Sequence, residues 1–276
     1  MSLPALILIH GYTFDHTMWN SVVVELGKHT KVITPDLPGF GDNPVEINEP
    51  SIDRMADDVA SLFEFHHLSH AVVVGMSMGG YVALSFADRH KTQIAGLGLV
   101  STQAHADAPE AREGRRALIE KIRSTGIQPA IEALLPKLFA GKNGGNPDLA
   151  KFATEGAERA GVEGLSWALQ AMATRPDRNS MLRTLHVPAV VIHGVDDKII
   201  PAERARQMSD SIPDSKYVEL PNVGHAAPLE APKAVAGALL DLLKRSADFL
   251  AKHSRPHDER SPDRPGVIWS PSERGL

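Results

Sequence analysis

The chain has 276 residues, of which 42% are hydrophobic, and its formal net charge at pH 7 is −5. This length is sufficient for one large α/β domain with a substantial core, and the acidic balance argues against a nucleic-acid partner. The sequence contains no cysteine, which excludes disulfides, thiolate metal sites and a cysteine nucleophile and is consistent with a cytoplasmic protein.

The first apolar run, residues 3–9, ends at His10-Gly11. It is too short to cross a membrane as a helix, and it lacks the charged start and the cleavage site of a signal peptide. We therefore interpret it as a core strand, and we expect a cytoplasmic protein that does not contact a membrane.

Apolar strands alternate with amphipathic helices along most of the chain, which predicts an α/β fold with a parallel sheet. The strands are expected near residues 5–10, 31–35, 71–75, 94–100, 187–193 and 215–220. The helices of this alternation are expected near residues 17–28, 51–67, 78–90, 202–211 and 231–250.

Residues 103–185 interrupt the alternation, because they are rich in Ala, Glu, Arg and Leu and contain no strand pattern. Proline and glycine breakers divide this segment into about four short helices. Since the segment lies between two strands of the sheet, we expect it to form a cap over the site. Residues 112–123 are interpreted as a mixed-charge helix face. Arg175 is interpreted as a surface or salt-bridge residue, with binding of a substrate carboxylate as the alternative. Apolar side chains of the cap are predicted to line the substrate pocket: Leu134, Leu135, Leu138, Phe139, Leu165, Trp167 and Met172.

The end of the chain has a different composition, since residues 255–265 are charged and rich in proline. Such a segment buries too little apolar area to become ordered. The sequence therefore predicts a core of residues 1–102 and 186–250, an inserted helical cap of residues 103–185 and a disordered tail of residues 251–276.

The most informative motif is Gly-x-Ser-x-Gly at residues 75–79, which joins an apolar run to a helical pattern. A strand, this motif and a helix are the context of a nucleophile elbow, a tight turn that exposes Ser77 and requires small residues two positions away on each side. A serine hydroxyl is a weak nucleophile. It therefore needs a base, a group that orients the base, and an anion site.

Candidates for the base and its partner follow two later strands. The run at 187–193 leads into a turn with Asp196 and Asp197, and the strand at 215–220 leads into a loop with His225. The carboxyl ends of parallel strands meet at one edge of a sheet, where ligands bind. These side chains are therefore expected to lie near the serine.

The anion site is expected to consist of backbone N–H groups. One is that of Met78, which follows the nucleophile and begins a helix, where unpaired N–H groups and the helix dipole favour negative charge. The other comes from the loop after His10-Gly11, through Tyr12 or Thr13. His66, His67 and His70 fall at a helix end and are interpreted as dipole partners rather than metal ligands, so no metal or cofactor is predicted.

Together, these motifs make the chain resemble the α/β-hydrolase family. The matching motifs are His10-Gly11, the residues 36–41, the elbow, Gly194-x-x-Asp197 and Gly224-His225. They occur in the order and at the spacings of the family. The sequence Ser77-Met78-Gly79-Gly80, the Arg175-Pro176-Asp177 stretch and the lid region are similar to the small-esterase branch, which includes enzymes like 3-oxoadipate enol-lactonase.

The resemblance assigns the remaining roles and the order of the sheet. The family places its acid three residues after a strand-ending glycine and four before a proline, which selects Asp197, with Asp196 as the alternative. Its donor loop points to the N–H of Tyr12. Most members carry two strands before the one that ends in His-Gly, whereas only residues 1–4 precede it here. We therefore expect six parallel strands, with the strand at 31–35 on an edge next to the strand at 5–10.

The resemblance also implies the reaction. Ser77, His225 and Asp197 would cleave a small-molecule carboxylic ester or lactone through an acyl-enzyme. Relatives with this triad also hydrolyse carbon–carbon bonds, act as hydroxynitrile lyases or perhydrolyse, and some proteins with this fold only bind ligands; these remain alternatives. The substrate and the oligomeric state are left open.

Overall fold

A computed structural model describes residues 2–45 and 49–253. Within this part of the chain, six strands form one sheet with the order β2-β1-β3-β4-β5-β6, and every neighbouring pair is parallel. The predicted α/β fold, strand order and edge position of β2 are therefore confirmed. The strands are β1 Ala5–Ile9, β2 Val32–Ile33, β3 Ala71–Met76, β4 Ile94–Val100, β5 Ala189–Gly194 and β6 Ser215–Leu220.

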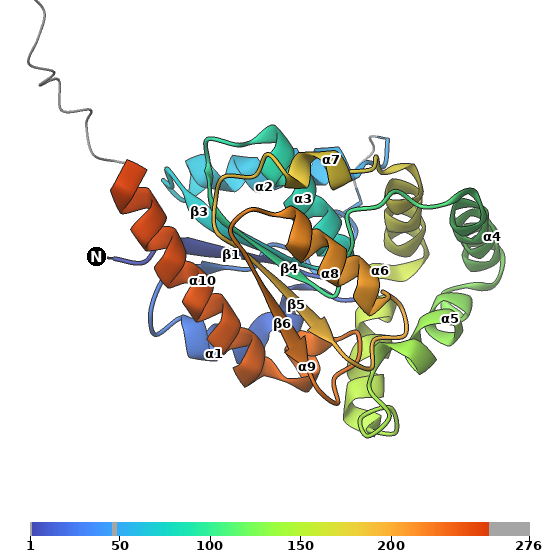
Figure 1. Cartoon of the computed structure of the whole chain (residues 1–276). Helices are drawn as coiled ribbons and strands as arrows, with labels where there is room; N and C mark the ends of the chain where they lie inside the picture. The colour runs from blue at the N-terminus through green and yellow to red at the C-terminus, as the bar shows by residue number, and fades with distance from the viewer. Residues whose placement is uncertain (1, 46–48, 254–276) are drawn as a thin grey trace, which may run out of the picture.

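Helices cover both faces of the sheet (Figure 1). On one face lie α2 (Ile52–Phe65), α3 (Met78–Arg89) and α8 (Ala202–Ser211); on the other lie α1 (Asn20–Leu26) and α10 (Pro232–His253). Alternate side chains of a strand point to opposite faces. Accordingly, Ile7 and Ile9 of β1 belong to the buried cluster that includes α2 and α3, whereas Leu6 and Leu8 belong to the cluster that includes α1 and α10. The short elements are η1 (His16–Trp19), α7 (Asn179–Leu182) and α9 (Ala227–Glu230).

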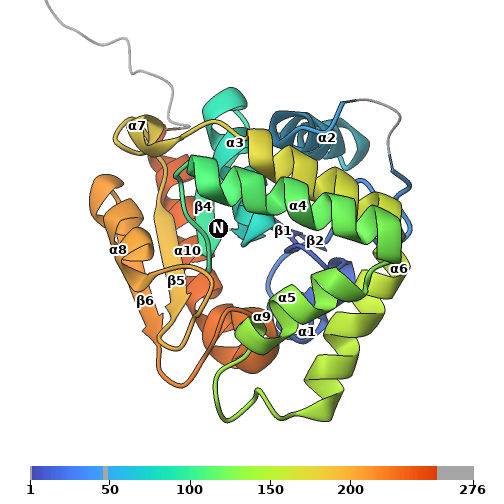
Figure 2. The same ribbon diagram turned by 90° about the vertical axis from the view of Figure 1, so that its right-hand side faces the viewer.

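Three helices between β4 and β5 lie beyond the carboxyl ends of the strands (Figure 1), and we refer to them as the cap helices. They are α4 (Pro109–Thr125), α5 (Gln128–Leu138) and α6 (Pro147–Thr174). Figure 2 shows α4 and α6 running side by side across this end of the molecule, with α5 beside them.

Two cap helices are longer than the sequence suggested. Pro109 begins α4 and Gly126, with φ 85°, ends it, as expected of these residues. Pro136, however, lies inside α5 without ending it. The 28-residue α6 contains a break at Gly161, where φ is 62°, so a glycine divides it where no proline does.

The end of α10 differs from the predicted boundary of the tail. This helix continues through His253, so residues 251–253 belong to it, whereas the rest of the predicted tail, residues 254–276, lies outside the described residues. Among the described residues, no helix has the length and apolar character that spanning a membrane would require.

Candidate active site

Ser77 occupies a tight turn between β3 and α3. Its backbone has φ 52° and ψ −112°, a conformation that is unfavourable for a residue with a Cβ atom and that is found at functional sites. Two hydrogen bonds hold it there: the N–H of Ser77 donates to the carbonyl of Val100 at 2.9 Å, and the Thr102 hydroxyl donates to the carbonyl of Ser77 at 2.8 Å. The last residue of β4 and the segment that follows it thus support the strained turn.

The two glycines of the elbow are required for space. A Cβ atom on Gly75 would lie 1.9 Å from the carbonyl oxygen of Gly79, and one on Gly79 would lie 2.3 Å from that of Ile9. Neither glycine has a positive φ, so the constraint is the close approach of α3 to β3 and β1. This is the spatial requirement that the motif predicted for the positions flanking Ser77.

Ser77, His225 and Asp197 form a continuous chain of hydrogen bonds. The Ser77 hydroxyl lies 2.9 Å from Nε2 of His225, and Nδ1 of His225 lies 2.8 Å from Oδ2 of Asp197. The second carboxylate oxygen of Asp197 accepts the N–H groups of Ile199 at 2.8 Å and Ile200 at 3.0 Å. This arrangement requires the tautomer with a proton on Nδ1, which leaves Nε2 free to accept the serine proton.

The geometry distinguishes the two adjacent acids. The side chain of Asp197 is fully buried beneath His225, whereas Asp196 is exposed. Burial alone would raise the pKa of Asp197. The charge of His225 and the hydrogen bonds from that ring and from the two N–H groups outweigh it and hold the pKa below the usual value of 3.8. Asp197 is therefore an anion at neutral pH.

The loop that carries His225 is tied to the cap by Glu230. One oxygen of its carboxylate accepts the N–H of Gly224 at 2.9 Å, and the other accepts the N–H of Ala140 at 2.8 Å and the amide of Asn143 at 2.7 Å. The N–H of His225 donates to the carbonyl of Leu138 at 2.9 Å. Glu230 was not predicted from the sequence, because no local pattern shows that it reaches a segment 90 residues away in the chain.

The loop after β1 lies against the elbow. A Cβ atom on Gly11 would be 2.6 Å from the sulfur of Met76 and 3.6 Å from the Cβ of Ser77. His10 is fully buried beneath this loop; Nδ1 donates to the carbonyl of Gly11 and Nε2 accepts the N–H of Leu37, both at 2.9 Å. Burial lowers the pKa of His10 below 6.5, so this ring is neutral and structural.

The N–H groups of Tyr12 and Met78 remain available beside Ser77. Within residues 2–45 and 49–253, neither group donates a hydrogen bond to the protein. Met78 is the first residue of α3, where no intrahelical acceptor exists and the helix dipole is positive. Tyr12 lines the same cavity as Ser77, whereas Thr13 lines a neighbouring one.

A cavity of about 80 Å³ opens beside Ser77 and His225. The predicted residues Leu134, Leu138 and Met172 line it. The cavity is also lined by Tyr12 and by five residues for which the sequence predicted no pocket role: Phe14, Met76, Tyr81, Arg115 and Ile199. Arg115 lies within the helix face that was interpreted as simply charged, and its position in the sequence gives no signal that it turns inward.

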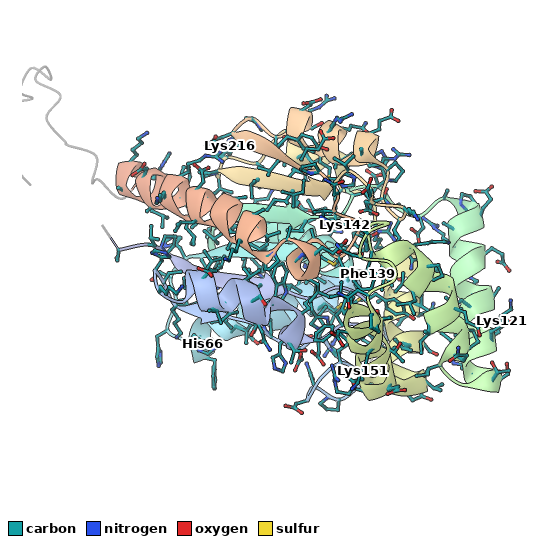
Figure 3. All side chains as sticks on the ribbon, turned by 90° about the horizontal axis from the view of Figure 1, so that it is seen from below. His66, Lys121, Phe139, Lys142, Lys151 and Lys216 are labelled. Atoms are coloured by element: carbon teal, nitrogen blue, oxygen red, sulfur yellow. The ribbon has the colours of Figure 1, made fainter. Side chains whose placement is uncertain are left out.

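The predicted pocket residues Phe139 and Trp167 do not line this cavity. Trp167 precedes Met172 by five residues on α6, which places the two side chains about 140° apart around the helix axis. Both side chains are buried in the same core cluster, but only Met172 lines the cavity. Phe139 follows the end of α5 in an extended conformation, with φ −118° and ψ 150°, and is buried where the cap meets the core (Figure 3). Leu135 and Leu165 do not line it either.

One cluster among the described residues has the composition of a metal site: Asp15, His16 and Asp36. Asp15 is paired with Arg159 at 2.7 Å and caps the N-terminus of η1, and His16 lies 2.9 Å from Asp36. Because the guanidinium group of Arg159 already occupies the carboxylate of Asp15, the cluster is better explained as a set of contacts that hold the loop in place than as a cation site. His66, at the end of α2, lies on the side of the molecule away from the cap helices (Figure 3).

Comparison with known proteins gives the same family as the motifs. The sequence profile of the alpha/beta hydrolase fold matches residues 4–232, and the chain therefore belongs to this family. A hydrolase of Metapseudomonas resinovorans, named 2-hydroxy-6-oxo-6-(2'-aminophenyl)hexa-2,4-dienoic acid hydrolase, is 30% identical over 259 residues, which cover 88% of this chain and 85% of that protein.

Two solved structures are similar over most of their length. A thermophilic esterase from Thermogutta terrifontis, with malate bound, is 36% identical, with a TM-score of 0.85 and coverage of 89% of this chain and 91% of the other. The enol-lactonase from Burkholderia xenovorans is 26% identical, with a TM-score of 0.79 and coverage of 88% and 92%. These matches place the chain in the small esterase and lactonase branch of the family.

Proposed function

We propose that this protein is a serine hydrolase that cleaves a small carboxylic ester or lactone. The observation that carries the proposal is the chain of hydrogen bonds from the Ser77 hydroxyl through His225 to Asp197, at 2.9 and 2.8 Å. A buried carboxylate fixes the imidazole, the imidazole faces a serine on a strained turn, and the serine opens onto a cavity. These features support the assignment of an acyl-transfer site.

In the acylation step, the Ser77 oxygen attacks the carbonyl carbon of the substrate while Nε2 of His225 accepts the hydroxyl proton. Asp197 holds the ring in the required tautomer and stabilises the imidazolium that forms. When the tetrahedral intermediate collapses, the carbon–oxygen bond of the ester breaks, and His225 returns the proton to the leaving alkoxide. Water then attacks the acyl-serine by the same route and releases the acid.

The N–H groups of Tyr12 and Met78 are proposed to bind the oxyanion of both intermediates. Their support is the lack of an acceptor for either group among the described residues, and the contact of the Gly11 loop with the elbow. Donors that are already aligned stabilise charge as it develops without reorganising, which is a large part of catalysis by such sites.

The test of this assignment is the Ser77→Ala variant. Its turnover of p-nitrophenyl acetate should fall by several orders of magnitude, on the order of 10⁴-fold or more, because the remaining site only binds and polarises the ester. The variant should keep the thermal midpoint of the wild type within a few degrees. If the variant retained most of the turnover, Ser77 could not be the nucleophile.

Hydrolysis of a carbon–carbon bond is the second candidate, and the match to the Metapseudomonas hydrolase favours it. That protein is named for a dienoic acid with an aminophenyl group, whereas the cavity of about 80 Å³ suits a short acyl group better. A panel of short esters, lactones and dienoates separates the two candidates, since only one class should reach a high kcat/KM. The same panel, extended to cyanohydrins and peracid formation, tests lyase and perhydrolase activity. Failure of a fluorophosphonate to label the protein would instead indicate a ligand-binding member of the fold.

A further inference from the structure

Two leucines of α5 separate the cavity beside Ser77 from a second, apolar crevice. The crevice has a volume of about 10 Å³ and lies between α5 and α6, which are neighbours in the cap (Figure 2). Leu134 and Leu138 line both the cavity and the crevice, and no other described residue does so. Since these two side chains lie one turn apart on the same face of α5, we refer to them as the leucine wall between the two spaces.

The crevice is suited to a hydrocarbon chain, because all of its described lining residues except two threonines are apolar. On one side lie Ala153 and Ala157, which are one turn apart on α6 and leave space because their side chains are small. On the other side lie Ile131 and Leu135 of α5, and both are half-buried. The crevice therefore borders the molecular surface, and a chain that entered it from the cavity would extend outward.

The wall of the cavity on the side of α4 is held by ion pairs. Nε of Arg115 donates to Oδ2 of Asp107 at 2.6 Å, and the other carboxylate oxygen pairs with Nη1 of Arg175 at 2.8 Å. Arg175 is buried and forms the salt bridge expected from the sequence, and its guanidinium carbon lies 4.0 Å from the ring centre of Tyr81, which also lines the cavity. An acyl chain can therefore lengthen more easily toward α5, where only apolar side chains block it.

The two residues of the leucine wall differ in what depends on them. The carbonyl of Leu138 accepts the N–H groups of His225 at 2.9 Å and Ala226 at 3.0 Å, and Leu138 is fully buried. A change at this residue would therefore disturb the loop that carries the histidine. Leu134 lies one turn earlier and is half-buried, so its side chain can be shortened without moving that loop.

We propose that Leu134 limits the length of the acyl group that Ser77 accepts, because it closes the cavity toward the crevice between α5 and α6. This proposal rests on the ester hydrolysis proposed above and names its substrate class, which is esters of short, unbranched carboxylic acids. A water molecule takes up about 30 Å³ of the liquid, so the cavity of about 80 Å³ has room for roughly three groups of that size, which corresponds to an acyl group of about two to four carbon atoms.

The test compares p-nitrophenyl butyrate with p-nitrophenyl octanoate. In the wild type, kcat/KM should be about tenfold or more higher for the butyrate, because the longer chain meets the leucine wall. Leu134→Ala removes three carbon atoms from the wall and joins the cavity to the crevice. The ratio of kcat/KM for the octanoate to that for the butyrate should then rise about tenfold or more, since each methylene that becomes buried contributes roughly fourfold. Leu134→Val, which removes a single carbon atom, should raise the ratio to a smaller extent.

The matched control is Leu135→Ala. Leu135 is the next residue on α5 and lines the crevice but not the cavity, so the same loss of side chain leaves the leucine wall intact. The ratio should stay within about twofold of the wild type, since the acyl chain gains no apolar contact. If Leu134→Ala hydrolyses both esters with the wild-type ratio, or if Leu135→Ala raises the ratio equally, the leucine wall is refuted while the esterase proposal stands.

A binding experiment keeps the two proposals separable if neither ester is hydrolysed. Calorimetric titration should then give a Kd for octanoate that is about tenfold lower in Ser77→Ala/Leu134→Ala than in Ser77→Ala, whereas the Kd for butyrate should stay within about twofold. This result would support the leucine wall although ester hydrolysis fails. If the Kd for octanoate is unchanged, or falls equally in Ser77→Ala/Leu135→Ala, the leucine wall is refuted as well.

Discussion

Replacement of Glu230 by glutamine tests whether the cap holds the histidine loop in place. The carboxylate of Glu230 accepts three hydrogen bonds, from Gly224 on one oxygen and from Ala140 and Asn143 on the other. In the glutamine that replaces it, only the amide oxygen can accept hydrogen bonds, because the NH₂ group is a donor. In its better orientation Glu230→Gln keeps the pair from the cap and turns an NH₂ group toward the N–H of Gly224, which precedes His225.

The expected loss of stability can be calculated from these changes in hydrogen bonding. One hydrogen bond to a charged group disappears and two become neutral, which should lower the free energy of unfolding by about 2–3 kcal/mol. For a domain of this size, the midpoint of thermal unfolding should then fall by roughly 4–10 °C. Displacement of the His225 loop should lower kcat for p-nitrophenyl acetate about tenfold or more, since small errors in alignment are costly in acyl transfer.

The assay is calorimetric unfolding together with steady-state kinetics, and the control is Glu219→Gln. Glu219 lies on β6, which leads into the same loop, but its side chain is 38% exposed and pairs with Arg206 at 3.0 Å. This control should change the unfolding free energy by less than about 0.5 kcal/mol. A Glu230→Gln protein with wild-type stability and kcat would refute the idea that this carboxylate positions the loop.

Three further predictions concern other parts of the site and its support. Gly79→Ala places a Cβ atom 2.3 Å from the carbonyl oxygen of Ile9; it should destabilise the protein by about 3 kcal/mol or more or abolish soluble expression, whereas Gly237→Ala, which meets nothing within 4 Å, should fold normally. Asp197→Asn should lower kcat by about 10⁴-fold with little change in KM, because the amide favours the wrong tautomer; equal kcat values would remove Asp197 from the triad. Burial lowers the pKa of His10 from 6.5, so below about pH 6.5 the unfolded chain binds a proton that the folded protein does not. The free energy of unfolding, measured in urea, should therefore fall as the pH drops below about 6.5. This group contributes at most about 1.4 kcal/mol per pH unit. Constant or rising stability between pH 6.5 and 5 would contradict that.

The sequence predicted the sheet and the relation of the triad to it, because both depend on the chain order of local patterns. Each of Ser77, Asp197 and His225 follows an apolar strand, and in a parallel sheet such positions meet at one edge. The expected order of the six strands came from the resemblance to the family, and the structure has the same order. The choice of Asp197 over Asp196 came from the family spacing, and the buried contact with His225 agrees with it.

The sequence did not predict which side chains of the cap face the cavity. Their directions depend on the rotation of each helix and on where it ends. Met172 and Trp167 are buried on the same helix, but only Met172 lines the cavity. Phe139, which follows the end of α5 in an extended conformation, does not line it. Glu230 was not predicted because its partners in the cap lie about 90 residues away in the chain. Arg115 was not predicted because a charged helix face gives no sign of which residue turns toward the cavity.

Trapping of the acyl-enzyme tests the central claim most directly. The wild-type protein is mixed with p-nitrophenyl acetate, quenched in acid within milliseconds to seconds, and digested for mass spectrometry. The account predicts an acetyl group on Ser77, formed with a burst of one p-nitrophenolate per active site, and no such adduct in Ser77→Ala. Acetylation of a different residue, or rapid turnover that neither forms this adduct nor depends on Ser77, would contradict the account.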